Sequence, residues 1–514
     1  MLEPQNNHSN NKRIAKNTLF LYFRMLFMMA VTLYTSRIVL ATLGIEDYGI
    51  YNVVGGVVIM FSFINSAMST ATQRYLSYEL GTNNLDRLKT VFSISIIIHF
   101  AIAFIVLILA ETVGLWFLEN KLVIPENRMD AAFWVYQISI VSCMISIVSL
   151  PYNAAIIARE RMSAFAYISI FEVVGKLLLV YLLVLIASDK LIFYAIFVCI
   201  VQIIIRIIYG WYCKKNFQET SFSFVWDKKL FSTMMSFSGW NMFGCIAGVC
   251  LTQGTDILLN LFFGPVVNAA KGISTQVQAA INSFCANFQT AINPQIVKSY
   301  ASNNMTYVHN LLFTSSRLSF YLVLLFSIPI MLETNQILHL WLKDVPNYSA
   351  LFVQLSMVIS LSGALSNTLI MANGATGDVR KLMTTVGLLF WSVIPLSYVW
   401  LKLGGEPPVV FFVQIGLLMI AHIIRLKIVG KQLAFSFLDY CRKVLFQIVL
   451  VLIICFIPPY VLKTNMDESW LRLVLVTIIS TISVLVTVFF VGITTEERNL
   501  AKNFIVNKFK KIRK

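Results

Sequence analysis

The sequence has little charge for its length. Only 12% of its 514 residues are Asp, Glu, Lys or Arg, whereas 58% are hydrophobic. Soluble domains average about 25% charged and about 45–50% apolar residues. This composition excludes a protein that folds in water over most of its length. It predicts a chain that lies largely within a lipid bilayer.

Recognisable metal and catalytic patterns are also missing. The eight cysteines are scattered, with no CxxC pair and no cluster with histidine, so neither a disulfide framework nor a zinc site is predicted. No HxxxD motif or accessible carboxylate dyad occurs, which argues against a membrane enzyme of polysaccharide synthesis. No cofactor is expected. The first apolar run is too long for a cleavable signal peptide and predicts a helix that stays in place.

What the sequence does contain is a series of apolar segments, each about twenty residues long or longer. Such a length crosses a hydrocarbon core of about 30 Å at about 1.5 Å rise per residue. The pattern predicts an all-α polytopic membrane protein with about fourteen transmembrane helices. We expect them near residues 17–41, 48–72, 90–118, 131–157, 164–187, 190–212, 231–262, 265–293, 311–332, 350–372, 382–402, 408–429, 443–462 and 470–492.

The net charge of +16 is distributed as membrane topology requires. Most basic residues fall in alternate connections and in the C-terminal tail "NKFKKIRK", whereas the other loops, such as "ASDK" and "LGGEPP", are short and mixed or acidic. The positive-inside rule therefore predicts that both termini are cytoplasmic. A nucleic-acid partner is not expected. The tail is interpreted as a topology signal, with contact to anionic lipid as the alternative.

Landmarks repeat when the sequence is shifted by 220 residues. Gly44 aligns with Gly264, Asn83-Asn84 with Asn303-Asn304, and Asn153 with Asn373. The shift predicts a duplicated six-helix unit whose two copies are parallel, because six is even. The predicted organisation is an N-terminal lobe at 1–213, a cytoplasmic linker at 214–230, a C-terminal lobe at 231–430, and two extra helices with a basic tail at 431–514.

These features resemble a known superfamily. Two six-helix lobes plus two helices, "GIEDYGIYNV" after the first helix and the basic turn in "PYNAAIIARERM" after the fourth are similar to the polysaccharide-transport branch of the multidrug/oligosaccharidyl-lipid/polysaccharide (MOP) exporters. This branch includes the Wzx-type flippases of O-antigen or capsule repeat units. The resemblance covers essentially the whole chain and implies a MATE-like fold.

The resemblance also implies a function. It implies movement of undecaprenyl-pyrophosphate-linked oligosaccharide from the inner to the outer leaflet of the bacterial cytoplasmic membrane, by alternating access. The expected partners are this lipid-linked oligosaccharide, membrane lipids and the polysaccharide polymerase machinery, with a monomer as the transport unit. In such flippases, cationic residues of the first, second and eighth helices line the cavity. Arg24 and Lys271 fit this pattern, but the second helix lacks a mid-membrane base, since Arg74 lies at its end.

Charged residues inside the membrane are candidates for function, because a charge at the bilayer centre costs at least about 2.5–3.5 kcal/mol. Arg24 is predicted to line the cavity, whereas Arg37 either lines it or snorkels to the outer interface. Asp256 would pair with Lys271 or Arg37, or bind a coupling proton or sodium ion. Glu172 and Lys176 have the i, i+4 spacing of a structural ion pair.

Polar residues follow one face of the predicted eighth helix. They are Lys271, Thr275, Gln278, Asn282 and Gln289. The second helix has a comparable series, namely Ser62, Asn65, Ser69 and Gln73. Lipid cannot satisfy such groups, so both faces are predicted to point towards a cavity. The alternative is hydrogen bonding between helices.

Three other functions remain open at the level of sequence. A multidrug and toxin extruder of the same superfamily, a cation-coupled drug antiporter, would have a more acidic cavity and commonly twelve helices. A membrane enzyme would need larger outer loops or a polar catalytic cluster. A structural subunit of a synthesis complex is the third. The cationic bias and the two extra helices favour the flippase.

Overall fold

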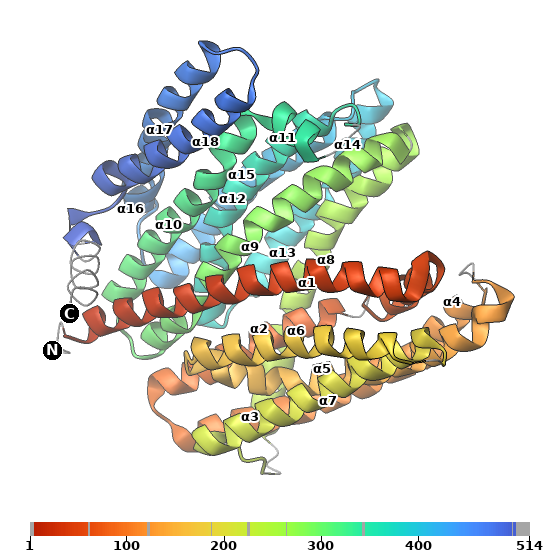
Figure 1. Cartoon of the computed structure of the whole chain (residues 1–514). Coiled ribbons are helices and arrows are strands. Elements are labelled where there is room, and N and C mark those ends of the chain that lie inside the picture. Colours follow the sequence, from red (N-terminus) through yellow and green to blue (C-terminus); the bar gives the residue numbers. More distant parts are fainter. Residues whose placement is uncertain are drawn as a thin grey trace, which may run out of the picture. The chain divides into compact units, whose positions relative to one another are not determined.

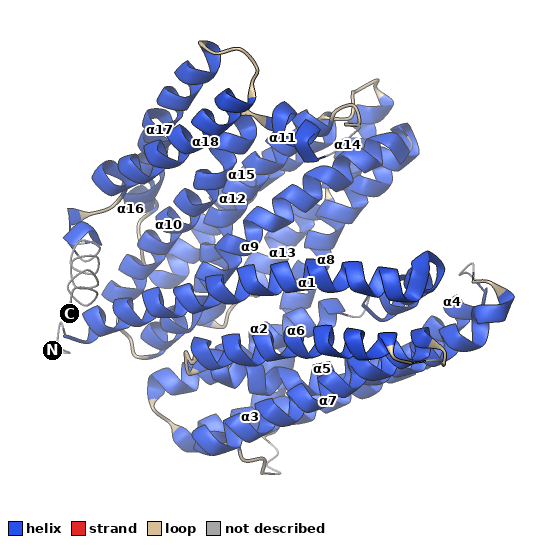
Figure 2. Cartoon of the chain, viewed as in Figure 1, coloured by secondary structure: helices blue, strands red, loops and turns tan. Residues whose placement is uncertain are grey.

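The protein is helical throughout the part of the chain that the structure describes. The computed structural model describes residues 5–499, except 60–61, 121–123, 187, 224–226, 264, 342–344 and 496, and it contains no strand among them (Figure 2). Eleven helical segments in these residues are long and apolar enough to cross a membrane. The chain is therefore an integral membrane protein. The basic tail from residue 500 onwards lies outside the described residues.

Every one of the fourteen predicted helices has a counterpart. In the first half the helices are α1 (Gln5–Ile59), α2 (Ser62–Thr82), α3 (Leu85–Leu109) with its continuation α4 (Leu115–Asn120), α5 (Met129–Ala158), α6 (Met162–Val184) and α7 (Lys190–Asn216) (Figure 1). In the second half they are α8 (Lys228–Phe263), α9 (Pro265–Ala301), α10 (Met305–Leu332), α12 (Ser349–Thr376), α13 (Arg380–Trp391) with α14 (Val393–Lys402), and α15 (Val409–Leu433). The additional helices are α16 (Phe437–Tyr440), α17 (Phe446–Thr464) and α18 (Trp470–Thr487), and a short α11 (Thr334–Trp341) follows α10.

The boundary between the first two predicted helices falls where the sequence predicts it. α1 consists of two helices that meet at a sharp kink at Gly44, which has φ 81° and ψ 170° and lies between the predicted segments 17–41 and 48–72. Only glycine adopts such a conformation readily, because a Cβ would clash with the backbone. The predicted segment 48–72 therefore corresponds to the part of α1 beyond the kink and to the start of α2, and residues 60–61 between them lie outside the described residues.

The 220-residue repeat is visible in the turns that follow α2 and α9. Asn83 and Asn303 have nearly identical left-handed φ values of 56° and 58°. In each turn the next residue donates its N–H to a carbonyl five residues earlier, at 3.3 Å in the first copy and 3.0 Å in the second. Such bonds close the C-terminus of a helix in a Schellman-type turn. The same local structure therefore forms at the same place in both copies.

Helix packing repeats in the same register. In the first half α5 packs against α3 and α7, and in the second half α12 packs against α10 and α15. These are the helices that a shift of 220 residues superposes. Moreover, a Cβ at Gly81 would lie 2.8 Å from the Cβ of Ala301, its counterpart under the shift. Contact between equivalent residues is what a pseudo-two-fold axis produces.

The chain separates into two compact units. The first comprises Met1–Ile246, Thr290–Asn304 and Gly377–Arg380, and the second comprises Ala247–Gln289, Met305–Thr376 and Lys381–Lys514. The extra pair α17 and α18 therefore belongs to the second unit, where both helices pack against α10. The predicted lobe boundaries at residues 213, 230 and 430 stay a prediction, because compactness alone does not define the ends of a repeat.

Large apolar side chains on the spanning helices are turned outward. Phe104, Leu178 and Ile207 are 60%, 59% and 63% exposed. Soluble proteins rarely expose extended apolar patches, whereas a helix that faces lipid does so by necessity. The distribution of these side chains agrees with the membrane assignment.

Arg128 connects three segments of the first unit through two carboxylates. Its guanidinium donates to Asp47 at 2.8 and 2.6 Å and to Asp189 at 2.7 and 3.2 Å. Asp189 also caps α7 by accepting from the N–H of Leu191 at 3.0 Å. Such forked contacts are charge-assisted and fix geometry. They hold the connections before α5 and α7 to the segment beyond the Gly44 kink.

This network predicts a loss of stability in acid. Partial burial by itself would raise the pKa of Asp189, but the hydrogen bonds and the charge of Arg128 outweigh it, so the pKa is lowered. The ionised carboxylate therefore stabilises the fold at pH values above the pKa of Asp in the unfolded chain, which is about 3.9. That contribution is lost as the pH falls through the lower pKa that Asp189 has in the folded protein. Unfolding temperatures measured between pH 7 and pH 3 should fall less steeply for Asp189→Asn than for the wild type. Asp130→Asn, at an exposed acid in the first turn of α5, should follow the wild type, and identical curves for all three proteins would contradict the prediction.

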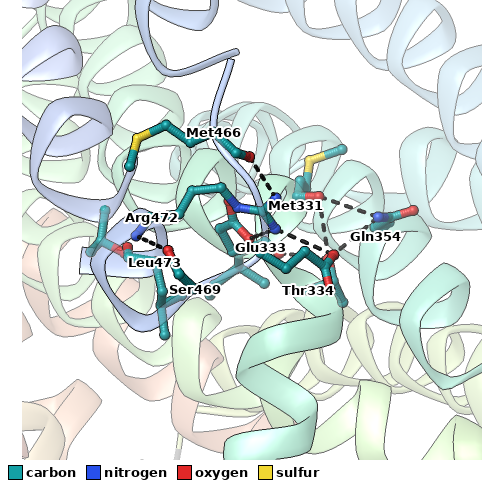
Figure 3. Close-up of polar contacts among 11 residues, drawn as sticks. Met331, Glu333, Thr334, Gln354, Met466, Ser469, Arg472 and Leu473 are labelled. Carbon is teal, nitrogen blue, oxygen red and sulfur yellow. Dashed lines mark hydrogen bonds and ion pairs between the residues drawn. The ribbon is translucent and has the colours of Figure 1, made fainter. Parts of the chain in front are cut away.

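An ion pair ties α18 to the helices of the second unit. Arg472 Nη2 lies 3.0 Å from Glu333 Oε2, and both side chains are almost fully buried (Figure 3). The guanidinium also donates to the carbonyl of Met466 at 3.2 Å and lies 3.3 Å from the exposed Glu468. Nearby, Gln354 of α12 donates to the carbonyl of Met331 at 3.2 Å and to Thr334 Oγ1 at 3.3 Å. The extra helix pair is therefore joined to the bundle by a buried charge pair as well as by apolar packing.

Candidate functional site

Arg24 lies on α1 with its side chain directed onto α6. Its Nη1 donates to Ser169 Oγ at 3.3 Å, and its guanidinium stacks over the ring of Phe165 at 4.5 Å. The side chain is half-buried. A cation over an aromatic face is stabilised by the ring quadrupole. The guanidinium is thus held against a neighbouring helix inside the bundle, which is compatible with the predicted position at a cavity.

Glu172 and Lys176 form the ion pair that their spacing indicates. Lys176 Nζ lies 2.7 Å from Glu172 Oε1, and Gln202 on α7 donates to the same oxygen at 3.2 Å. Glu172 is also near enough to Arg24 for their charges to interact. Among the described residues, two cations and one carboxylate therefore form a single polar cluster with a net charge of +1. The sequence spacing within α6 showed the pair but not its connection to Arg24, which depends on how α1 packs on α6.

Lys271 is buried on α9, in the second unit. Its side chain is 7% exposed, and its Nζ lies 4.2 Å from the centroid of the Phe411 ring on α15. Asp256 on α8 is close enough to interact electrostatically with Lys271. Among the described residues the two do not form a direct ion pair, and Asp256 Oδ1 is buried without a hydrogen-bond partner. The predicted pairing of Asp256 with Lys271 is thus present as proximity of charges, without contact.

The polar stripe of α9 follows the edge between its packed and its exposed faces. Gln278 is half-buried and donates to the carbonyl of Ser356 at 3.5 Å, and the buried Gln289 donates to Ser319 Oγ and to the carbonyl of Ala364, both at 3.2 Å. By contrast, Thr275 and Asn282 are exposed. The interpretation as bonding between helices therefore applies to Gln278 and Gln289. For Thr275 and Asn282 the cavity-lining role stays a prediction.

The other predicted residues are only partly described. Ser69 and Gln73 on α2 are half-buried, and Gln73 Nε2 is buried without a hydrogen-bond partner among the described residues. Arg37 and Asn65 lie on α1 and α2, but their side chains fall outside the described part of the structure. Within the described residues, no three His, Cys, Asp or Glu side chains come together as a metal site. The cavity-lining role of these residues stays a prediction.

A second cluster, which the sequence did not indicate, surrounds Glu160 in the connection between α5 and α6. Glu160 is 4% exposed, and its backbone has a left-handed φ of 58°. It accepts from Arg13 Nε at 2.8 Å, Lys298 Nζ at 2.6 Å and Gln295 Nε2 at 2.6 Å. In the sequence, the signal for this cluster is the acid between two bases in "ARER". The cluster joins the start of α1 and the end of α9 to one connection.

The sequence is similar to known proteins at the level of family and of fold. The polysaccharide biosynthesis protein family matches residues 14–302. No curated protein matches the sequence. Among solved structures, a MATE protein in the straight conformation is 10% identical with a TM-score of 0.70, and the match covers 83% of this chain and 96% of that one.

Two further structures show the same likeness. A MOP superfamily transporter from Pyrococcus furiosus, whose title states that the reverse polarity of its binding pocket suggests a different function, is 10% identical with a TM-score of 0.69. That match covers 82% of this chain and 96% of the other. The MATE transporter ClbM in complex with Rb⁺ is 15% identical with a TM-score of 0.66, over 81% and 94% of the two chains.

These matches agree with the resemblance stated from the sequence. The family match spans more than half of the chain, and the structural matches span most of it. At these identities the structures establish the fold and not the substrate. The chain belongs to the polysaccharide biosynthesis protein family and has the MATE-like fold of the MOP transporters.

Proposed function

We propose that the protein is a flippase that moves undecaprenyl-pyrophosphate-linked oligosaccharide repeat units, of O-antigen or of capsular or exopolysaccharide, from the inner to the outer leaflet by alternating access. One observation carries the proposal: the chain combines membership of a polysaccharide biosynthesis family with a transporter fold. A protein of that family with this fold is best explained as moving a polysaccharide precursor across the membrane.

The charges inside the bundle support an anionic cargo. The cluster around Arg24 has a net positive charge, and Lys271 is a buried cation. Guanidinium and ammonium groups suit the oxygens of a pyrophosphate. Accessible amides such as Asn282 suit the hydroxyls of a sugar. The proposal assigns recognition of the pyrophosphate to Arg24 and Lys271, with Arg37 as a further candidate.

Asp256 is the residue that we propose for coupling to an ion. It is a half-buried carboxylate on a spanning helix, near a cation but not in contact with it, with one oxygen that has no hydrogen-bond partner in the described part of the chain. Such a group is available to a proton or a sodium ion. Transport measured in vesicles against an imposed proton or sodium gradient should respond to one of the two in the wild type. Asp256→Asn is expected to abolish this response, and an unchanged response would remove Asp256 from the mechanism.

The runner-up is a multidrug extruder, because the fold is shared with structures named as MATE proteins. An extruder of cationic drugs would require an acidic cavity, whereas the predicted cavity residues include more bases than acids. The similar transporter from Pyrococcus furiosus is described as having a pocket of reversed polarity and a different function. Pocket polarity is therefore the property that should separate the two functions in this fold.

Deletion of the gene tests the proposal. The deletion strain is expected to lose surface polysaccharide and to accumulate lipid-linked oligosaccharide on the cytoplasmic face of the membrane. Both effects should be reversed by the wild-type gene. A strain that keeps its surface polysaccharide and becomes drug-sensitive would instead establish the extruder.

The proposed setting is the bacterial cytoplasmic membrane, with both termini in the cytoplasm, a monomer as the transport unit, and the polysaccharide polymerase machinery as a partner.

A further inference from the structure

A cavity of about 540 Å³ lies in the first unit, at the ends of several of its helices. Its walls come from the start of α1, the turn after α2, the connection between α5 and α6, and the ends of α7 and α9. The positive-inside rule places these segments in the cytoplasm. The residues that matter for the argument are Arg13, Lys16, Asn17, Glu160, Arg161 and Lys298. Arg24, which is predicted to line the transport cavity, is not among the lining residues.

The cavity has an excess of positive charge. Among the residues that the structure describes, five bases line it, namely Arg13, Lys16, Arg159, Arg161 and Lys298, together with one acid, Glu160. Glu160 pairs with Arg13 and Lys298, and Arg159 pairs with Glu219 at 2.7 Å. Five bases against these two acids leave a net charge of +3. Within the described residues, Lys16 and Arg161 have no carboxylate within ion-pair distance, and both side chains are exposed.

A buried hydrogen-bond donor also lines the cavity. Asn17 is 5% exposed, and its Nδ2 has no hydrogen-bond partner among the described residues. Leaving such a donor unsatisfied is unfavourable, so its presence in a cavity wall suggests that a ligand accepts from it. The first turn of α6 lines the same cavity through Ser163, and no side chain of the described residues caps this helix. An uncapped helix N-terminus favours an anion there.

We propose that this cavity, hereafter the α1–α6 pocket, binds a phosphate group on the cytoplasmic side of the membrane. Lys16 and Arg161 would supply the charge, and Asn17 Nδ2 would donate to a phosphate oxygen. Arg13 and Lys298 are held by Glu160 and shape the wall. A phosphate group is complementary to this pocket because its negative charge matches the excess of bases and its oxygens can accept from Asn17. The group belongs either to the headgroup of an anionic lipid or to a soluble phosphate compound. This binding does not depend on which cargo the protein moves.

The test measures binding to the purified, detergent-solubilised protein in two arms. In one arm inorganic pyrophosphate is titrated, and in the other the retention of phosphatidylglycerol is followed by native mass spectrometry. The variant is Lys16→Gln combined with Arg161→Gln. Its matched control is Lys214→Gln combined with Lys215→Gln, which removes the same charge at the end of α7 without touching the lining residues. Asn17→Leu tests the buried donor, and unfolding temperatures verify that each variant folds.

Wild-type protein and the control pair are expected to bind in at least one arm, and the pocket variant to bind about tenfold or more weakly. Binding of pyrophosphate would show that a soluble phosphate compound can occupy the pocket without a lipid. Retention of phosphatidylglycerol alone would identify a lipid headgroup. Absence of binding in both arms, or an equal loss in the control pair, would overturn the proposal. Because the readout is binding and not transport, the outcome is separate from that of the deletion experiment.

Discussion

Replacing Lys271 by methionine is expected to abolish most of the transport while the protein still inserts and folds. Methionine keeps the length and the apolar stem that pack near Phe411, but it removes the buried charge. In the proposed complex, Lys271 forms a buried charge pair with the pyrophosphate, and truncating one partner of such a pair costs about 2–5 kcal/mol. At 1.4 kcal/mol per factor of ten, this corresponds to a loss of about 30-fold or more in recognition of the pyrophosphate. The measurement is surface polysaccharide in the deletion strain complemented with the variant, normalised to the amount of protein in the membrane.

The control for this prediction is Lys402→Met. Lys402 also lies over an aromatic ring, that of Tyr398 at 5.9 Å, but it is exposed on α14 and lies outside the polar stripe. It should complement fully. Wild-type levels of polysaccharide with Lys271→Met would show that the charge has no role in recognition.

A double variant separates two roles of Lys271. The readout is binding of the lipid-linked oligosaccharide to the purified protein, because Asp256→Asn is itself expected to uncouple transport. If the lysine only neutralises Asp256, Lys271→Met with Asp256→Asn should bind the cargo more tightly than Lys271→Met alone. If the lysine binds the cargo, the double variant should bind it as weakly as the single one. Neighbouring charges couple non-additively, and the difference measures that coupling.

Replacing Arg472 by methionine is expected to be the most destabilising single change in the second unit. It leaves Glu333, whose side chain is 1% exposed, buried without the guanidinium that compensates its charge. Breaking a buried ion pair by removing one partner costs about 3–5 kcal/mol. The unfolding temperature of the purified protein should fall clearly, and α17–α18 should become more sensitive to limited proteolysis.

Two further variants check that the unpaired charge of Glu333 causes this destabilisation. Arg472→Met combined with Glu333→Met removes both charges and should recover most of the lost stability, because apolar replacement of a whole buried pair is often neutral. Glu468→Ala, at the exposed end of the same network, should have almost no effect, since its side chain is 71% exposed. Equal unfolding temperatures for Arg472→Met and Glu468→Ala would refute the assignment.

Local patterns explain what could be predicted about the fold. The fourteen apolar segments identify the helices because a spanning segment must satisfy its own backbone hydrogen bonds, and only a long helix does so. The repeat of 220 residues could be found because the turns at Asn83 and Asn303 need the same left-handed backbone. The boundary between the first two helices could be found as well, since the kink lies at Gly44, a glycine that also marks the repeat.

The candidate site shows the limit of the same reasoning. The i, i+4 spacing of Glu172 and Lys176 predicts a pair because both residues lie on one helix. Their proximity to Arg24 could not be predicted, because it depends on the packing of α1 against α6. Likewise, helical periodicity placed Lys271, Gln278 and Asn282 on one face of α9, but it could not show that this face lies at the edge of a packed surface.

By itself, the sequence determined that this protein is a polytopic helical membrane protein with an internal repeat and a resemblance to polysaccharide exporters. Composition, helix length and repeated turns are local properties, and they do not depend on how the helices are arranged. Only the tertiary structure decided which charges meet. Glu160, Gln295 and Lys298 come together across 138 residues of sequence, and Lys16, Asn17 and Arg161 line one pocket. Contacts between distant segments are set by how whole helices pack, which no short stretch of sequence specifies.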